Sequence, residues 1–159
     1  MLGVCNKTKY LGHFLTDQLS DDDMYRQCRM LYAQANMLAR KFYMCSDDVK
    51  IRLFQAYCTP LYTAPLWAKF KKTTIHKLQV AYNDCMRILL QKPRWCSASE
   101  LFCKARVNTF QALLRNLMYK FIGRLDGSQH GIIKLLANPS KSVVRYQSHL
   151  WKYWYNCLL

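Results

Sequence analysis

The sequence predicts a mainly α-helical bundle with a short N-terminal β-hairpin. Three observations support this fold class: apolar residues recur at spacings of three and four over long stretches, capping sequences precede these stretches, and the 159 residues include only five glycines and four prolines. So few turn-forming residues disfavour an all-β fold. The length fits one domain with a single core and a small appendage.

At the N-terminus, residues 2–5 and 9–15 are predicted to be two short strands joined by a turn at Asn6-Lys7. A hairpin of this size is unstable alone and should pack on another element. We therefore expect three parts: a β-hairpin over residues 1–17, a helical domain over residues 18–138, and an aromatic, basic tail over residues 139–159.

Two helices should follow the hairpin. Ser20 is the predicted N-cap of the first, and acidic residues 21–23 fill its first turn, where carboxylates interact favourably with the helix dipole. This helix should end near Met44. Ser46 is the predicted N-cap of the second. One apolar stripe should run along the first helix through Met24, Cys28, Leu31, Ala35, Leu38 and Phe42. The second helix carries the apolar residues Val49, Leu53, Phe54, Ala56 and Tyr57.

The middle of the chain holds an aromatic stretch and then a third helix. Pro60 and Pro65 should break residues 57–67 into a short helix or turn. Thr73 or Thr74 is the predicted cap of the third helix, which should stop before Pro93. Its predicted buried residues are Ile75, Leu78, Tyr82, Cys85, Met86 and Leu89.

Further capping sequences predict the remaining helices. Ser97 and Glu100 form a capping box before a short helix. Asn108 with Gln111 repeats this pattern before a longer helix, which Gly127 should terminate. A last short helix is predicted over residues 132–137.

The charge distribution favours a polyanionic partner. Residues 1–48 carry six basic and six acidic side chains, whereas residues 49–159 carry eighteen basic and three acidic ones. Such an excess is typical of proteins that bind phosphate groups. The candidate phosphate contacts are Lys50, Lys69, Lys71, Lys72, Lys77, Arg87 and Arg94, and the candidate base-stacking groups are Trp67, Phe70 and Trp95.

The sequence contains no motif for catalysis or metal binding. The acidic clusters at residues 21–23 and 47–48 each follow a serine at a predicted helix start, so capping explains them better than a two-metal site does. The eight cysteines lack the paired short spacings of a zinc site, and the four histidines lie outside nucleophile motifs. We expect no catalytic residue, no metal and no cofactor.

Other features favour a location inside the cell. There is no apolar leader with a cleavage site, and the cysteine spacing does not suggest a disulfide scaffold. The longest uncharged run, residues 53–68, is too short to cross a bilayer. We expect a nuclear or cytoplasmic protein that is not secreted and has no membrane partner.

A series of short motifs runs through residues 7–125. It comprises Lys9-Tyr10-Leu11-Gly12-His13, then the segments 19–23, 26–29, 31–38, 49–50, 53–58 and 80–87, and finally Leu89-Leu90 and residues 93–99. In this order the motifs resemble the end of the reverse transcriptase of LINE-type (non-LTR) retrotransposons. The ordered series is more specific than any single member of it.

The resemblance implies a part of an RNA-directed DNA polymerase. Tyr10, Leu11 and Gly12 would form the last hairpin of the palm, near the primer strand, and the following helices would form a thumb-like bundle that holds an RNA/DNA template–primer duplex. The family's aromatic-x-Asp-Asp turn, its upstream aspartate and its Cys/His knuckle are not found in these 159 residues. We therefore expect a nucleic-acid-binding thumb fragment of a retroelement polymerase that is not itself catalytic, with the palm domain as a second partner.

Two alternatives stay open. The apolar stripes could dock onto another polypeptide, which would make the chain a helical protein-interaction module with Trp151 and Trp154 as anchors. A metal-dependent nuclease would instead need Asp22 and Asp23 as metal ligands.

Overall fold

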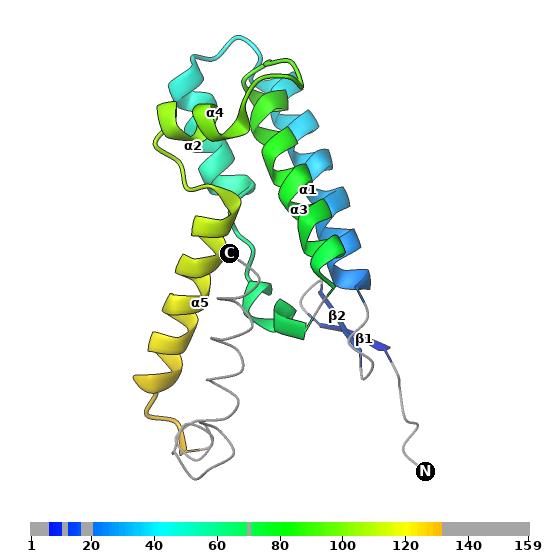
Figure 1. Cartoon of the computed structure of the whole chain (residues 1–159), viewed down its shortest axis with the longest axis vertical. Coiled ribbons are helices and arrows are strands. Elements are labelled where there is room, and N and C mark those ends of the chain that lie inside the picture. The colour runs from blue at the N-terminus through cyan, green and yellow to red at the C-terminus, as the bar shows by residue number, and fades with distance from the viewer. Residues whose placement is uncertain (1–6, 11–12, 17–20, 70, 132–159) are drawn as a thin grey trace. The chain divides into compact units, whose positions relative to one another are not determined.

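The computed structural model describes residues 7–10, 13–16, 21–69 and 71–131. The mainly helical class with a short hairpin is confirmed (Figure 1). In chain order the elements are β1 (Lys7–Tyr10), β2 (His13–Thr16), α1 (Asp22–Lys41), α2 (Asp47–Tyr57), the 3-10 helix η1 (Ala64–Lys69), α3 (Lys72–Leu89), α4 (Ala98–Lys104) and α5 (Phe110–Asp126).

The described residues form two compact units. The first holds the hairpin, α1 to α4 and Phe110, and the second holds residues 62–68 and α5 from Gln111 onward. The hairpin thus groups with the first four helices, and α5 belongs to a different unit from them. The predicted boundary at residue 138, the helix over residues 132–137 and the tail with Trp151 and Trp154 lie outside the described residues.

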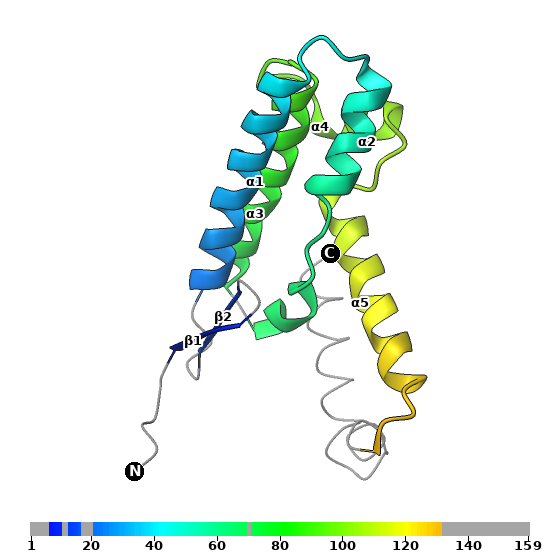
Figure 2. The same ribbon diagram turned by 180° about the vertical axis from the view of Figure 1, so that it is seen from behind.

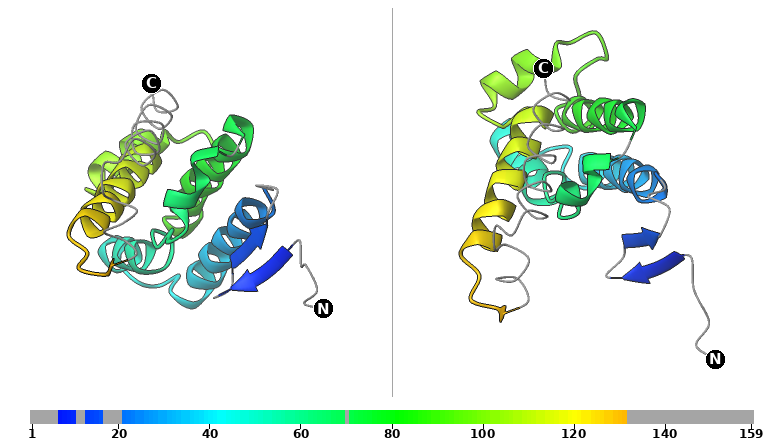
Figure 3. Two further views of the ribbon diagram at one scale, coloured as in Figure 1. Left: turned by 90° about the horizontal axis from the view of Figure 1, so that it is seen from below. Right: turned by 60° about the horizontal axis from the view of Figure 1, so that its bottom comes forward.

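The hairpin is present, but its turn is not where the sequence predicted it. β1 and β2 pair antiparallel, with Lys7 opposite Thr16 and Tyr10 opposite His13, so two residues join the strands. The predicted turn at Asn6-Lys7 is wrong, because Lys7 already lies in a strand. β2 contacts α1, and Figure 3 shows the hairpin beside the start of that helix.

The two long helices of the first unit, α1 and α3, lie side by side and run parallel (Figure 1, Figure 2). Three side-chain contacts link them, each between residues 52 or 53 positions apart in sequence. A nearly constant separation means that the helices advance in the same direction. The linked pairs are Asp21 with Thr74, Tyr25 with Lys77, and Tyr32 with Asp84.

The predicted inward faces of α1 and α3 are largely confirmed. The buried apolar residues of α1 are Met24, Leu31, Ala35 and Leu38, and those of α3 are Leu78, Ala81, Tyr82, Cys85, Met86 and Leu89. Cys28, Phe42 and Ile75 are half-buried. The sequence did not predict the buried polar residues Asp23, Gln27, Thr74 and Asp84 on the same helices.

The helix starts of α1 and α3 differ from the prediction. Asp21 occupies the N-cap position of α1, and Lys71 occupies that of α3. Thr74 lies inside the first turn of α3, where its hydroxyl donates a hydrogen bond of 2.6 Å to Asp21 Oδ2. The side chains of Asp21 and Thr74, both of residue types that often cap helices, therefore bond to each other and join α1 to α3. A tertiary hydrogen bond has replaced the local one that the sequence suggested.

In α2 the start is as predicted, with Ser46 at the N-cap, but only part of the apolar set named from the sequence is buried. Lys50 and Phe54 are buried, whereas Val49 and Tyr57 are 41% and 50% exposed. Ala56 is exposed as well. The inward face follows an i, i+4 spacing that begins at Lys50, whose four-carbon stem can be buried like an apolar side chain.

The predicted caps hold for α4 and only in part for α5. The Ser97 hydroxyl accepts a hydrogen bond of 3.4 Å from the Glu100 N–H, which confirms the predicted cap of α4. α5 ends at Asp126, directly before Gly127, as predicted. Its start at Phe110 lies two residues beyond the predicted cap Asn108, whose carbonyl instead accepts a 3.1 Å hydrogen bond from the Tyr82 hydroxyl.

Four aromatic rings form the centre of the first unit. Tyr82 of α3 contacts Phe54 of α2, Phe102 of α4 and Phe110, with ring centroids 5.1, 5.3 and 5.7 Å apart. All four side chains are at most 2% exposed. Aromatic pairs at such distances add attraction beyond the area that they bury. Tyr82 thus joins three elements of the unit.

Candidate nucleic-acid interface

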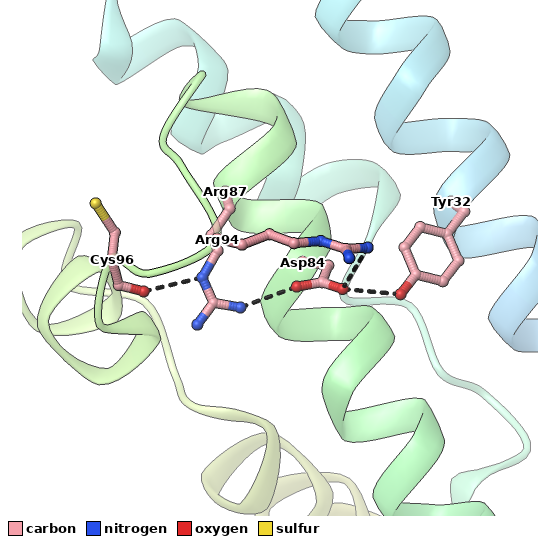
Figure 4. A network of polar contacts seen from close by, with 5 residues as sticks. All are labelled: Tyr32, Asp84, Arg87, Arg94 and Cys96. Carbon is pink, nitrogen blue, oxygen red and sulfur yellow. Dashed lines mark hydrogen bonds and ion pairs between the residues drawn. The ribbon is translucent and has the colours of Figure 1, made fainter.

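Asp84 is the centre of a polar network near the C-terminal end of α3 (Figure 4). Its Oδ2 accepts a 3.0 Å hydrogen bond from the Tyr32 hydroxyl, and its Oδ1 accepts one of 2.9 Å from Arg87 Nη1. Arg87 Nε in turn donates to the Cys96 carbonyl at 2.9 Å. Arg94 Nη2 lies 4.0 Å from Asp84 Oδ2. The network therefore joins α1, α3 and the loop that precedes α4.

The network places one carboxylate charge in the interior and compensates it there. Asp84 is 9% exposed, and Arg87 forms an ion pair with it. Burial, the hydrogen bond to Asp84 and the negative charge of Asp84 together raise the pKa of Tyr32 to about 12. Tyr32 is therefore a neutral donor over the physiological pH range.

The loop between α3 and α4 is held at both ends. The Lys92 N–H donates to the Arg87 carbonyl at 2.8 Å, and the Cys96 N–H donates to the Pro93 carbonyl at 3.1 Å. The Arg87 side chain holds Cys96 from the other side. Between these anchors, the side chain of Arg94 is 88% exposed and Trp95 is 87% exposed.

Four of the seven candidate phosphate contacts are exposed cations: Lys71, Lys72, Lys77 and Arg94. Lys77 lies 5.3 Å from the centre of the Tyr25 ring, which places its ammonium group beside α1. Lys71 and Lys72 are at the start of α3, next to the Asp21 that bonds to Thr74. This carboxylate weakens the positive potential around them.

The other three candidates differ in their surroundings. Lys50 is only 6% exposed, so most of its side chain is covered by protein. Arg87 is 17% exposed at its side chain and is engaged by Asp84 and Cys96. Lys69 is the last residue of η1, and its side chain lies outside the described part of the chain.

The sequence missed Arg29 as a candidate. It lies four residues after Tyr25 and three before Tyr32, so helical geometry puts all three on one face of α1. Tyr25 and Tyr32 both contact α3, and Arg29 is exposed. The α1–α3 seam, defined here by Arg29, Lys77 and Arg94, therefore carries three exposed cations. The parallel packing of the two helices places Lys77 beside Tyr25 and Asp84 beside Tyr32, so it sets where the cations of α3 lie along α1.

The three candidate stacking groups are not equivalent. Trp67 is 1% exposed and cannot stack on a ligand base without rearrangement. Phe70 lies outside the described residues. Trp95 is 87% exposed and follows Arg94 on the anchored loop.

The acidic residues of both clusters lie at helix starts, and two of them make contacts that stabilise the fold. Asp23 is buried and pairs with Arg26 at 3.1 Å, and Asp21 accepts from Thr74. Asp47 and Asp48 lie in the first turn of α2, as the capping interpretation predicted. Within residues 7–10, 13–16, 21–69 and 71–131, no three His, Cys, Asp or Glu side chains are grouped in a way that could hold a metal ion.

Two thiols are internal. Cys58 and Cys85 are fully buried and hydrogen-bond to each other. This bond and burial raise the pKa of Cys85, and burial also raises that of Cys28. These thiols are small core residues, as the sequence indicated.

Of the three residues assigned to the primer-proximal hairpin, only Tyr10 has a described backbone. It is the last residue of β1 and pairs with His13. Leu11 and Gly12 lie outside the described residues.

Comparison with known proteins gives no match: no family model, no curated protein and no solved structure is similar to this chain. In the described part of the chain, no helix combines the length and apolar character that a membrane span requires.

Proposed function

We propose that this chain is a nucleic-acid-binding thumb fragment of a retroelement RNA-directed DNA polymerase that grips a template–primer duplex and is not itself catalytic. The observation that carries the proposal is the α1–α3 seam, to which two helices and one loop each contribute one exposed cation. The charge balance of residues 49–159 supports the proposal, because these residues include eighteen basic and only three acidic side chains.

The geometry of the seam fits a nucleic-acid backbone. Tyr25 and Tyr32 bracket the seam on α1, and the step of seven positions from one to the other spans about 10 Å of helix. One strand of a duplex places about three phosphates in that length, at 3.4 Å per nucleotide. Asp84 offsets only part of this potential, because it is buried and pairs with Arg87 at 2.9 Å, whereas Arg94 lies 4.0 Å from it with an 88% exposed side chain.

The proposal is tested by salt-dependent binding. The triple variant R29A/K77A/R94A removes the seam cations, and R40A/K41A/K104A removes three charges from exposed residues elsewhere on α1 and α4. Fluorescence anisotropy with a labelled RNA/DNA duplex between 50 and 200 mM salt gives the slope of log K against log salt. The seam variant should flatten this slope by roughly 2 to 3, at about 0.9 per phosphate contact.

The control variant has the same net charge as the seam variant, so the two differ only in where the charges are removed. If duplex binding depends on the position of the cations, the control variant should bind like the unaltered chain. Equal losses in both variants would show that binding follows net charge alone. No complex with the unaltered chain at 50 mM salt would remove the proposal.

A protein-interaction module is the second candidate, and a specific observation favours it. Met30 and Met37 are 40% and 41% exposed on one face of α1, and Met44 beyond the helix is 81% exposed. Exposed methionines are common at adaptable binding surfaces. If this function holds, M30E/M37E should abolish self-association or partner binding in analytical ultracentrifugation and leave duplex binding unchanged.

A further inference from the structure

The most exposed large apolar side chain of the first unit in its described part is Trp95, at 87%. An indole on a surface usually finds apolar cover, because it is one of the largest hydrophobic side chains. Here it stands beside Arg94, whose side chain is 88% exposed, and close to the exposed Lys92. Residues 90–99 include no acidic side chain.

This exposure is not the result of a frayed segment. The loop is closed by hydrogen bonds from Lys92 to Arg87 at 2.8 Å and from Cys96 to Pro93 at 3.1 Å. The Arg87 guanidinium fixes the Cys96 carbonyl, directly after Trp95, and is itself held by Asp84 (Figure 4). The backbone position of Trp95 is therefore set in advance, which lowers the entropy cost of binding.

The neighbouring charges specify what kind of ligand fits. An indole face with two adjacent cations suits a ligand that has a flat π system and a negative charge on either side of it. An unpaired nucleotide has both, and stacking of a base on an aromatic side chain contributes about 1 to 3 kcal/mol. Paired bases inside a duplex keep their faces covered by their neighbours.

We propose that Trp95 stacks on the first unpaired base next to a nucleic-acid duplex, while Lys92 and Arg94 contact the phosphates that flank this base. The inference rests on the proposed function and adds a preference to it: the chain should bind a duplex with a single-stranded overhang more tightly than the same duplex with blunt ends.

The test uses the full chain and two labelled RNA/DNA duplexes, one blunt and one with a four-nucleotide overhang. Tyr43→Ala is the matched control, because Tyr43 is 60% exposed and lies on a different turn. Trp95→Ala should weaken overhang binding about tenfold and leave blunt-duplex binding unchanged. Trp95→Phe should retain most of the affinity, and Tyr43→Ala should change neither.

A second readout reports on stacking itself. With 2-aminopurine as the first unpaired base, saturating protein should quench its emission, and Trp95→Ala should abolish the quenching even at saturation. The inference is overturned if Trp95→Ala affects both duplexes equally, affects neither, or leaves the quenching intact. Failure of the proposed function gives a different result. In that case neither the unaltered chain nor any Trp95 variant binds the blunt duplex. Absence of binding to both duplexes would overturn both.

Discussion

The Tyr32 hydroxyl on α1 donates a 3.0 Å hydrogen bond to the Asp84 carboxylate on α3, although 52 residues separate them. This bond lies between two parallel helices whose connection includes α2 and η1. It sets the position of Asp84, which holds Arg87, which in turn holds the loop with Arg94 and Trp95. The orientation of the candidate interface thus depends on a pair of residues that does not itself contact a ligand.

Removal of either partner should destabilise the fold to different extents. Tyr32→Phe loses one hydrogen bond and should lower the free energy of unfolding by about 1 kcal/mol. Asp84→Asn also leaves the Arg87 guanidinium, 17% exposed, without its counter-ion, so about 2 to 3 kcal/mol is expected. Urea unfolding measures both. The double variant should lose less than the sum of the single losses, and strict additivity would contradict the network.

Tyr32 should also make stability depend on alkaline pH. Its pKa is raised from 10.0 to about 12 by burial and by Asp84, so the folded state prefers the neutral phenol. The resulting stabilisation is complete below pH 10 and is lost as the pH rises from 10 through 12. Urea midpoints between pH 8 and 11.5 should therefore fall more steeply for the unaltered chain than for Tyr32→Phe. Parallel curves would show that Tyr32 does not contribute.

Thr74 should matter for its hydroxyl and not for its place at a helix start. It is 1% exposed and bonds to Asp21 at 2.6 Å. Thr74→Val keeps the shape but leaves a carboxylate without this donor, which should cost about 1.5 to 3 kcal/mol in thermal or urea unfolding. Thr73→Val, at the exposed neighbouring position, is the control and should stay within about 0.5 kcal/mol of the unaltered chain. Similar losses in both would indicate a helix-propensity effect instead.

Lys50 tests whether burial or charge decides which cations bind. It is 6% exposed, whereas Lys77 is exposed beside Tyr25. Lys50→Met and Lys77→Ala remove the same charge. We expect Lys50→Met to leave the salt dependence of duplex binding unchanged, and Lys77→Ala to reduce its slope by about 0.9. An equal reduction in both, measured by anisotropy, would mean that Lys50 reaches the ligand.

Local sequence signals determined the helical class and several helix limits. Ser97 before α4, Ser46 before α2 and Gly127 after α5 each lie at a helix limit, and such limits could be predicted because the preferences of these residue types act within one or two helical turns. The periodic apolar residues of α1 and α3 predicted most of their inward faces in the same way. The surplus of basic side chains after residue 48 was also evident from the sequence.

Only the tertiary structure decided which of those basic side chains are available. Lys50 is buried, and Arg87 is paired with Asp84. Arg29 lies in residues 1–48, where basic and acidic side chains are equal in number, yet it belongs to the α1–α3 seam with Lys77 and Arg94. Parallel packing of α1 on α3 pairs residues about 52 positions apart. The periodicity within one helix shows which face is apolar but not how far that helix is shifted along the other. Hydrogen bonds such as Thr74 to Asp21 also displace the local caps, because a buried polar group is satisfied by whichever partner packing brings to it.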